Sequence, residues 1–344
     1  MRVLLDDVRF WFHDLCSCLQ DCFGTLLLRQ GRDPVEVLGA AWEFHHAPGP
    51  VAAEEFYYPA PRPTLGENLL PHHPVRAVWH EPQDVESSWQ DIRASIIDGR
   101  PAIVAVDNFH MPIRPAYGDV HAAHLMVVWG FDDEADEVYL LESTPPQYSG
   151  PVALADFRRA RSSANDSRPD TRDYFFAGSG IRGRWIEVTV TGPFPELDRE
   201  RAAEIVTANA RGFTDPDPDA GWSGLAGLTS WLADVCDRAE DAEKAGPALA
   251  ELYTAGWAAQ SAAALHADFL RGAGKRFDCD PLAQVGRQVD RLANHWTPLR
   301  ILGAHGSTAG VAVADQLRDR VRRFTADHRE AVQRLEAAAA ALVK

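Results

Sequence analysis

The chain of 344 residues changes character near residue 193, and this change constrains its fold more than any other feature. Before it, runs such as AIVAVDNF (102–109) and HLMVVWGFD (124–132) are nearly continuous in hydrophobicity, which is typical of buried strands. After it, segments rich in Ala and Leu carry apolar residues at 3.6-residue spacing, which predicts helices. We therefore expect an α+β domain over 1–192, followed by an all-α domain over 193–344.

Helices and strands mix in the first of these domains. The patterns predict helices over 18–31, 33–44 and 85–99, and two further strands over 137–143 and 184–190. The acidic run FDDEADEV has the composition of a hairpin turn between two of the strands, and the polar stretch 159–182 reads as a loop. In the second domain, TDPDPDAG (214–221) predicts a break between helices.

The acidic balance of the chain limits its partners. A net charge of −16 argues against nucleic acid and against an anionic membrane surface, whereas a small amine could be attracted. The sequence contains no apolar run of membrane-spanning length, and its first residues do not resemble a signal peptide. Five cysteines, an odd number, do not suggest a disulfide framework. We expect a cytoplasmic protein with reduced thiols.

Three cysteines and a histidine crowd into the stretch HDLCSCLQDC, just before a helical pattern. Ser17 and Gln20 fit the S-x-x-Q capping box, which makes Ser17 the N-cap and Cys18 the first helical residue. Gly31 follows the last apolar position and fits a C′ residue. Because the N-terminus of a helix favours an anion, we expect the pKa of Cys18 to be lowered.

The other cysteines allow simpler interpretations. Cys22 lies one turn further along the helix and is expected to pack in the core, and Cys16 falls before the helix. A metal site remains an alternative, since Cys and His are zinc ligands, but the C-x-C-x₃-C spacing matches no common zinc motif. It would use His13, Cys16, Cys18 and Cys22. Cys236 and Cys279 are expected to be packing residues of the helical domain.

A cysteine nucleophile needs a base, which is normally a histidine oriented by a carboxylate or an amide. His124 begins a predicted strand, and the hairpin that follows would bring Glu142, at the end of the next strand, beside its ring. His121, three residues earlier, is the alternative base.

Three stretches together resemble a known family. They are CLQDCFGTLLLRQGRDPVEVLG, GRPAIVAVDNFHMPIRPAYGDVHAAHLMVVWGFDD, and a helical tail that contains WSGLAGLTSWLADV and LHADFLRGAG. The chain resembles the papain-like cysteine peptidases, and more closely the family of butirosin-biosynthesis protein H. This resemblance implies a papain-like fold, and we expect no cofactor and no metal. It also implies acyl transfer from a carrier-protein thioester, or another acyl thioester, onto a small amine.

Site residues follow from the same resemblance. Cys18 would be the nucleophile, His124 the base and Glu142 the orienting acid. The loop from Asp107 to Tyr117 would border the substrate pocket, and the predicted substrate-binding residues are Asp107, His110, Tyr117, His121 and His13. The papain-like peptidases carry a glutamine before the cysteine that helps to form the oxyanion hole, and WFHDLCS has none. Backbone N–H groups near Cys18, with His13, would replace it.

Three functions remain open on these residues. The first is an acyltransferase, the second is a peptidase or amidase with water as acceptor, and the third is a non-catalytic binding protein on the same fold. An acidic carrier protein would need a local basic patch. FRRAR (157–161), Arg182 and Arg184 could supply it, or they could form a solvated loop.

Overall fold

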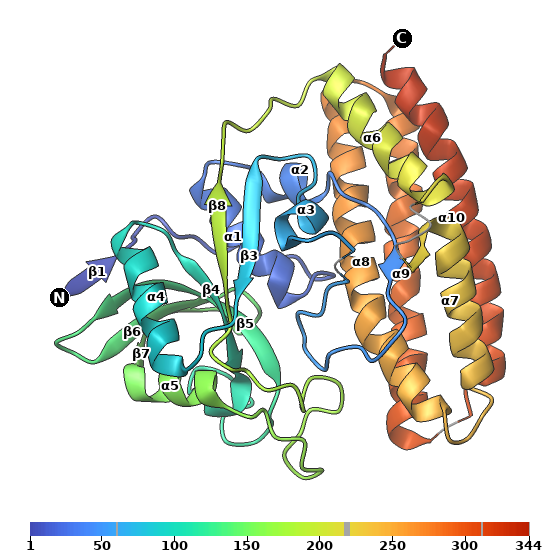
Figure 1. Cartoon of the computed structure of the whole chain (residues 1–344). Coiled ribbons are helices and arrows are strands. Elements are labelled where there is room, and N and C mark those ends of the chain that lie inside the picture. The colour runs from blue at the N-terminus through green and yellow to red at the C-terminus, as the bar shows by residue number, and fades with distance from the viewer. Residues whose placement is uncertain (60, 217–220, 311, 344) are drawn as a thin grey trace.

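The first part of the chain forms a seven-stranded antiparallel sheet (Figure 1). The computed structural model describes residues 1–59, 61–216, 221–310 and 312–343. The strands are β1 (Arg2–Leu4), β3 (Val75–His80), β4 (Ala102–Asp107), β5 (Ala123–Asp132), β6 (Glu137–Glu142), β7 (Tyr148–Ala153) and β8 (Trp185–Val190). Their order is β3-β8-β4-β5-β6-β7, and β1 pairs with β5. The four predicted strands and the hairpin between β5 and β6 are confirmed.

Helices cover both faces of this sheet, which explains why its central strands are continuously apolar. The helices are α1 (Cys18–Arg29), α2 (Pro34–Leu38), α3 (Leu65–Leu69), α4 (Val85–Ile97) and α5 (Leu154–Ser162). Ile103 and Ala105 of β4 join the core that contains α1. Val104 and Val106 alternate with them and join the core that contains α4 and α5. A strand buried on both faces has no polar side to alternate with.

The second part of the chain is all helical and stands beside the sheet (Figure 1). Its helices are α6 (Arg199–Thr214), α7 (Gly224–Arg238), α8 (Ala245–Arg276), α9 (Asp280–Ala309) and α10 (Ala314–Leu342). The α+β fold class followed by a helical region is thus confirmed, while the boundary at 192/193 stays a prediction. In the described ranges, no helix is both long and apolar enough to cross a membrane. Residues 217–220 of the predicted break lie outside the described residues.

Two predicted element boundaries are wrong. The helix predicted over 33–44 ends at Leu38, because Gly39 passes so close to α8 that a Cβ there would lie 2.4 Å from the carbonyl oxygen of Leu265. The loop predicted over 159–182 begins only after α5, whose Phe157 and Ala160 are buried under the sheet. Both residues lie in a sequence too rich in arginine to display an apolar stripe.

A long connection between α2 and α3 joins the two parts of the molecule. We call its described residues, 39–59 and 61–64, the strap. Trp42 enters the core of the helices, where its ring lies 4.6 Å from that of Phe213 and 5.3 Å from that of His266. Further along, β2 (His45–His46) pairs with β9 (Trp222–Ser223).

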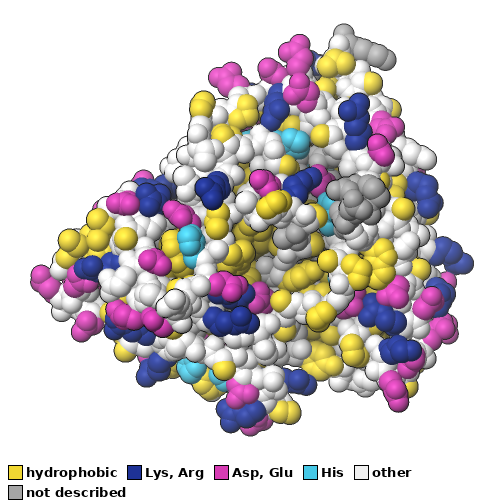
Figure 2. Space-filling model, viewed as in Figure 1, with side chains coloured by type: hydrophobic (Ala, Val, Ile, Leu, Met, Phe, Trp, Pro, Cys, Tyr) yellow, Lys and Arg dark blue, Asp and Glu magenta, His cyan; other side chains and the backbone are white. Residues whose placement is uncertain are grey.

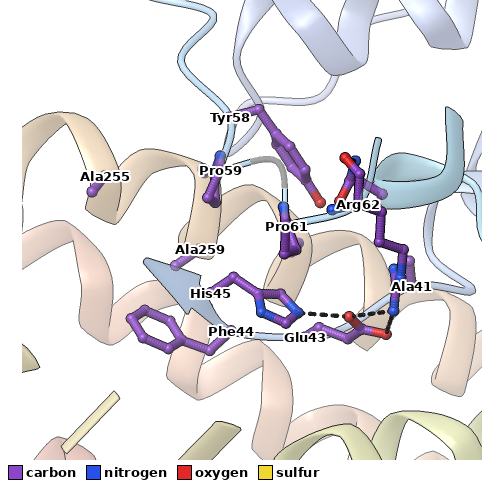
Figure 3. A pocket seen from close by; sticks show the side chains of 13 residues that line it. Ala41, Glu43, Phe44, His45, Tyr58, Pro59, Pro61, Arg62, Ala255 and Ala259 are labelled. Atoms are coloured by element: carbon purple, nitrogen blue, oxygen red, sulfur yellow. Dashed lines mark hydrogen bonds and ion pairs between the residues drawn. The ribbon is translucent and has the colours of Figure 1, made fainter. Parts of the chain in front are cut away.

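The strap also folds back on itself (Figure 3). The carboxylate of Glu43 accepts hydrogen bonds from Nη2 of Arg62 at 3.0 Å and contacts Nε2 of His45 at 2.8 Å. Burial favours the protonated form of Glu43, but His45 and Arg62 lower its pKa to about 2. The two ends of the strap are therefore tied together, and its middle, residues 51–58, crosses towards the sheet.

Candidate active site

The start of α1 has the geometry that the sequence predicts. Ser17 Oγ accepts a hydrogen bond from the backbone N–H of Leu19, and the N–H of Ser17 donates to Oε1 of Gln20, which completes the capping box. Cys18 is the first residue of the helix. Gly31 has φ +67° and closes the other end, as a C′ glycine does.

His124 lies near the start of β5 and is completely buried. The hairpin brings Glu142, the last residue of β6, to it, and Nε2 of His124 lies 2.6 Å from Oε2 of Glu142. The same carboxylate is held from two other sides. Nη1 of Arg114 lies 3.2 Å from Oε2, and the N–H of Thr144 donates to Oε1 at 2.7 Å. Glu142 can therefore fix the orientation of the imidazole ring.

A second carboxylate, which the sequence analysis missed, lies on the other side of the ring. Oε2 of Glu55, in the middle of the strap, is 2.5 Å from Nδ1 of His124. The Cys18 Sγ, a ring nitrogen of His124 and a carboxylate oxygen of Glu55 all lie within 4.8 Å of one another. The N–H of Glu55 also donates to the carbonyl of Ala123 at 3.2 Å, so the strap is bonded to β5 itself.

The two carboxylates decide the protonation state of the histidine. Burial alone would lower the pKa of His124, but Glu142 and Glu55 raise it well above its usual value. Burial would raise the pKa of Glu55, but His124, Arg114 and Arg300 lower it. His124 is therefore an imidazolium between two carboxylates in this structure.

The prediction of a lowered pKa for Cys18 is wrong in this state. Its side chain is only 2 % exposed, and burial followed by the Glu55 carboxylate raises its pKa to about 12, against the opposing effect of His124. Cys16 and Cys22 are buried as well, and burial raises the pKa of each well above its usual value. Cys18 differs from them because an imidazolium faces it.

Three of the predicted substrate-binding residues form a separate cluster around Asp107. Oδ2 of Asp107 lies 2.6 Å from Nδ1 of His121 and accepts from the hydroxyl of Ser163 at 2.5 Å. The ring of Phe109 stacks on His121, with centroids 4.0 Å apart, and His110 borders the same group. Across the described part of the chain, none of these side chains is hydrogen-bonded to the Cys18–His124 pair.

The other two predicted residues lie further out. Tyr117 is half exposed on the loop after β4. The ring of His13 is engaged elsewhere, since Nε2 lies 3.3 Å from Oδ2 of Asp268 and Nδ1 accepts from the N–H of Leu15. The geometry therefore aims neither nitrogen of His13 at Cys18. The role of each predicted site residue stays a prediction.

Two groups of donor atoms could hold a metal ion, Cys18–Glu55–His124 and Asp107–His110–His121. Two ligands on one tetrahedral zinc lie about 3.4 Å apart, because each is about 2.1 Å from the metal. The histidine–carboxylate pairs are closer than this, at 2.5 Å for Glu55 and 2.6 Å for Asp107. Their spacing is that of direct hydrogen bonds.

The prediction of a basic patch is wrong for two of its arginines, Arg161 and Arg184. Arg161 is fully buried and donates to the carbonyls of Ala105 and Arg184, at 3.1 and 3.0 Å. Arg184 is paired with Glu54. Both guanidinium groups point into the protein. For Arg161 the run FRRAR could not reveal this, because neighbouring arginines on α5 point in different directions.

A cavity of ≈ 440 Å³ borders the strap, and Cys18, Glu55 and His124 are not among its lining residues. It is lined by Leu19, which follows Cys18 in α1, by Glu54 and Phe56 on either side of Glu55, and by Trp79 of β3. Figure 2 shows apolar side chains gathered in the middle of this face of the molecule, between the sheet and the long helices.

The comparison with protein families concerns the first part of the chain. No curated protein matches the chain. Residues 17–143 match the family model described as butirosin biosynthesis protein H, N-terminal. This range runs from the N-cap of α1 to the residue after Glu142 and includes Cys18, Glu55 and His124. Residues 17–143 of this chain are therefore similar to the N-terminal part of butirosin biosynthesis protein H.

Proposed function

We propose that this protein is a cysteine acyltransferase of natural-product biosynthesis. Cys18 takes an acyl group from a thioester, such as that of a carrier protein, and passes it to an amine. In the first step Sγ of Cys18 attacks the thioester carbonyl and gives its proton, through His124, to the thiol that leaves. In the second step the amine attacks the acyl-cysteine, a C–N bond replaces the C–S bond, and the amine proton returns to Cys18 through His124.

The observation that carries this proposal is the contact of 2.6 Å between His124 and Glu142, with Cys18 beside the same ring. A nucleophile, a base and a group that orients the base are the three parts that such chemistry requires. The family match supports a biosynthetic reaction over protein degradation. The backbone N–H of Cys18, at the first helical position, supports a site for the oxyanion, because the first N–H groups of a helix have no intrahelical partner.

Burial of the site also supports transfer over hydrolysis. Cys18 and His124 are 2 % and 0 % exposed, so an acyl-enzyme formed there would be shielded from bulk water. The cavity beside the strap, lined by Phe56 and Trp79 and also by Glu54 and Arg184, has the size to hold a small acyl chain.

Intact-protein mass spectrometry tests the proposal. The protein is incubated with N-acetylcysteamine thioesters of acetyl, glycyl and 4-aminobutyryl groups, and the mass of the acyl adduct is measured. We expect an adduct on the wild type and none on Cys18→Ala, while Cys22→Ala, one turn along the same helix, keeps it. Adding an amine should discharge the adduct into an amide. Discharge only into the free acid would show a hydrolase, and no adduct at all would refute an acyl-enzyme.

A further inference from the structure

Glu55 is bonded to the nitrogen of His124 that the proposed chemistry needs to be free. Nε2 of His124 is held by Glu142, so Nδ1 is the nitrogen left to exchange a proton with Cys18. In this structure Nδ1 is bonded to Glu55 at 2.5 Å instead. While each N–H of the imidazolium is bonded to a carboxylate, neither nitrogen can exchange a proton with Cys18. The Glu55–His124 contact must therefore open during the reaction.

The Glu55 carboxylate is largely buried, with its side chain 13 % exposed, and leaving its cation would be costly without a replacement. Glu55 is suited to remain charged, since His124, Arg114 and Arg300 lower its pKa against the effect of burial. The N–H of Glu55 is bonded to the carbonyl of Ala123, which holds this part of the strap against β5. A replacement cation should therefore come to Glu55, beside Cys18.

Charged and aromatic groups surround Glu55. The guanidinium of Arg300, on α9, already lies over the rings of Tyr253 and Trp257, 4.5 and 4.3 Å from their centroids. Asp173 adds a second carboxylate, whose pKa is raised by burial and, less strongly, by Glu55. Two carboxylates that repel each other beside aromatic rings are both relieved by a positive group.

We propose that Glu55 leaves His124 and binds the ammonium group of the amine acceptor instead. This contact brings the nucleophilic nitrogen to the acyl group on Cys18. This proposal rests on the proposed function and adds the residue that selects an amine over water. The ammonium loses one proton to solvent, while Glu55 stays charged. The free amine then attacks the acyl carbon, the C–S bond breaks, and the second proton passes through Nδ1 of His124 to the sulfur of Cys18.

Glu55→Gln tests this role because it keeps the shape of the side chain and removes its charge. With N-acetylcysteamine thioesters as donors, we expect Glu55→Gln to form the acyl adduct at least as fast as the wild type, since His124 is released. The KM for cyclohexane-1,3-diamine as acceptor should rise at least about thirtyfold, the effect of removing one partner of a buried charge pair. Glu55→Asp should restore part of this loss. Asp14→Asn, which removes an exposed acid near α1, serves as the control and should change neither quantity.

Two outcomes would overturn the proposal. One is an unchanged KM for the diamine in Glu55→Gln. The other is slower formation of the acyl adduct in Glu55→Gln, which would show that Glu55 activates Cys18. Calorimetric titration with the same diamine separates this role from the proposed function. If the wild type forms no adduct, the acyltransferase is refuted. Binding of the diamine that is lost in Glu55→Gln and absent for cyclohexane-1,3-diol would still support the ammonium site, and no binding to the wild type would refute it.

Discussion

Glu142 and His124 are in contact at 2.6 Å because one hairpin folds the end of β6 back beside the start of β5. Replacing Glu142 with Gln removes the negative charge that orients the ring and stabilises the imidazolium. We expect kcat for acyl transfer to fall on the order of 10³- to 10⁴-fold, as when a triad carboxylate becomes an amide. Glu137→Gln, at the other end of the same strand, is the matched control. Equal loss in both variants would assign the effect to the strand and not to His124.

The ionisation of Cys18 should show in its alkylation by iodoacetamide. Because its pKa is about 12, the thiolate fraction, and with it the alkylation rate, should rise about tenfold per pH unit from pH 7 to 9. Peptide mass spectrometry measures the rate at Cys18, and Cys22→Ala removes the neighbouring thiol as a control. A rate that levels off below pH 8 would contradict this value.

Asp21 makes the stability of the fold depend on pH. Burial raises the pKa of its carboxyl to about 7 from a usual value of 3.8. The protonated carboxyl therefore stabilises the folded state fully below pH 3.8, and this stabilisation is lost as the pH rises through about 7. Asp21→Asn cannot ionise. We expect the free energy of unfolding of the variant, relative to the wild type, to improve by about 2 to 3 kcal/mol from pH 5 to pH 8. Urea titrations at the two pH values measure this difference. Asp14→Asn, at an exposed site, should show no such change.

Arg161 is a structural residue, and its loss should cost stability. Its guanidinium donates to the carbonyls of Ala105, Arg184 and Gly183, and Met would leave these buried acceptors without partners. We expect Arg161→Met to reduce the free energy of unfolding by about 3 kcal/mol or more. Arg159→Met, which removes an exposed arginine from the same helix, should cost less than about 1 kcal/mol. Comparable losses in urea denaturation would contradict the distinction.

Metal analysis tests whether the cluster of Cys18, Glu55 and His124 is an ion site. Because Glu55 and His124 are bonded directly, we expect the purified protein to hold no stoichiometric zinc, and chelator treatment to leave its melting temperature unchanged. One zinc per chain, lost in Glu55→Gln, would show that the three side chains open to bind a metal.

The sequence predicts the elements of the site better than its contacts. The capping box, the position of Cys18 and the hairpin of Glu142 depend on neighbouring residues, and local patterns describe them well. The prediction of a helix over 33–44 is wrong because Gly39 packs against α8. The two contacting residues are 226 positions apart in the chain, and no local sequence pattern contains such a contact. The prediction of a lowered pKa for Cys18 is wrong for a related reason. The start of a helix favours a thiolate, but burial, which is a property of the whole fold, opposes it.

Glu55 could not be predicted from spacing. It lies in VAAEEFYY, 69 residues before His124, and its neighbour Glu54 has the same side chain but pairs with Arg184. Which of two adjacent acids faces the histidine is decided by the path of the strap against β5. The signal available in the sequence was the pair of acids beside three aromatic residues, which is unusual for an exposed loop.

The anchoring of Trp42 among the helices bears on the order in which the protein is made. The cysteine, the histidine and Glu142 all leave the ribosome before α8, α9 and α10 exist, and N-terminal parts generally fold first. The strap that carries Glu55 has its partners at Phe213 and His266, which are synthesised later. During synthesis Trp42 therefore lacks its ring partners until α6 and α8 are made, whereas the bond of Glu55 to Ala123 involves only residues made earlier.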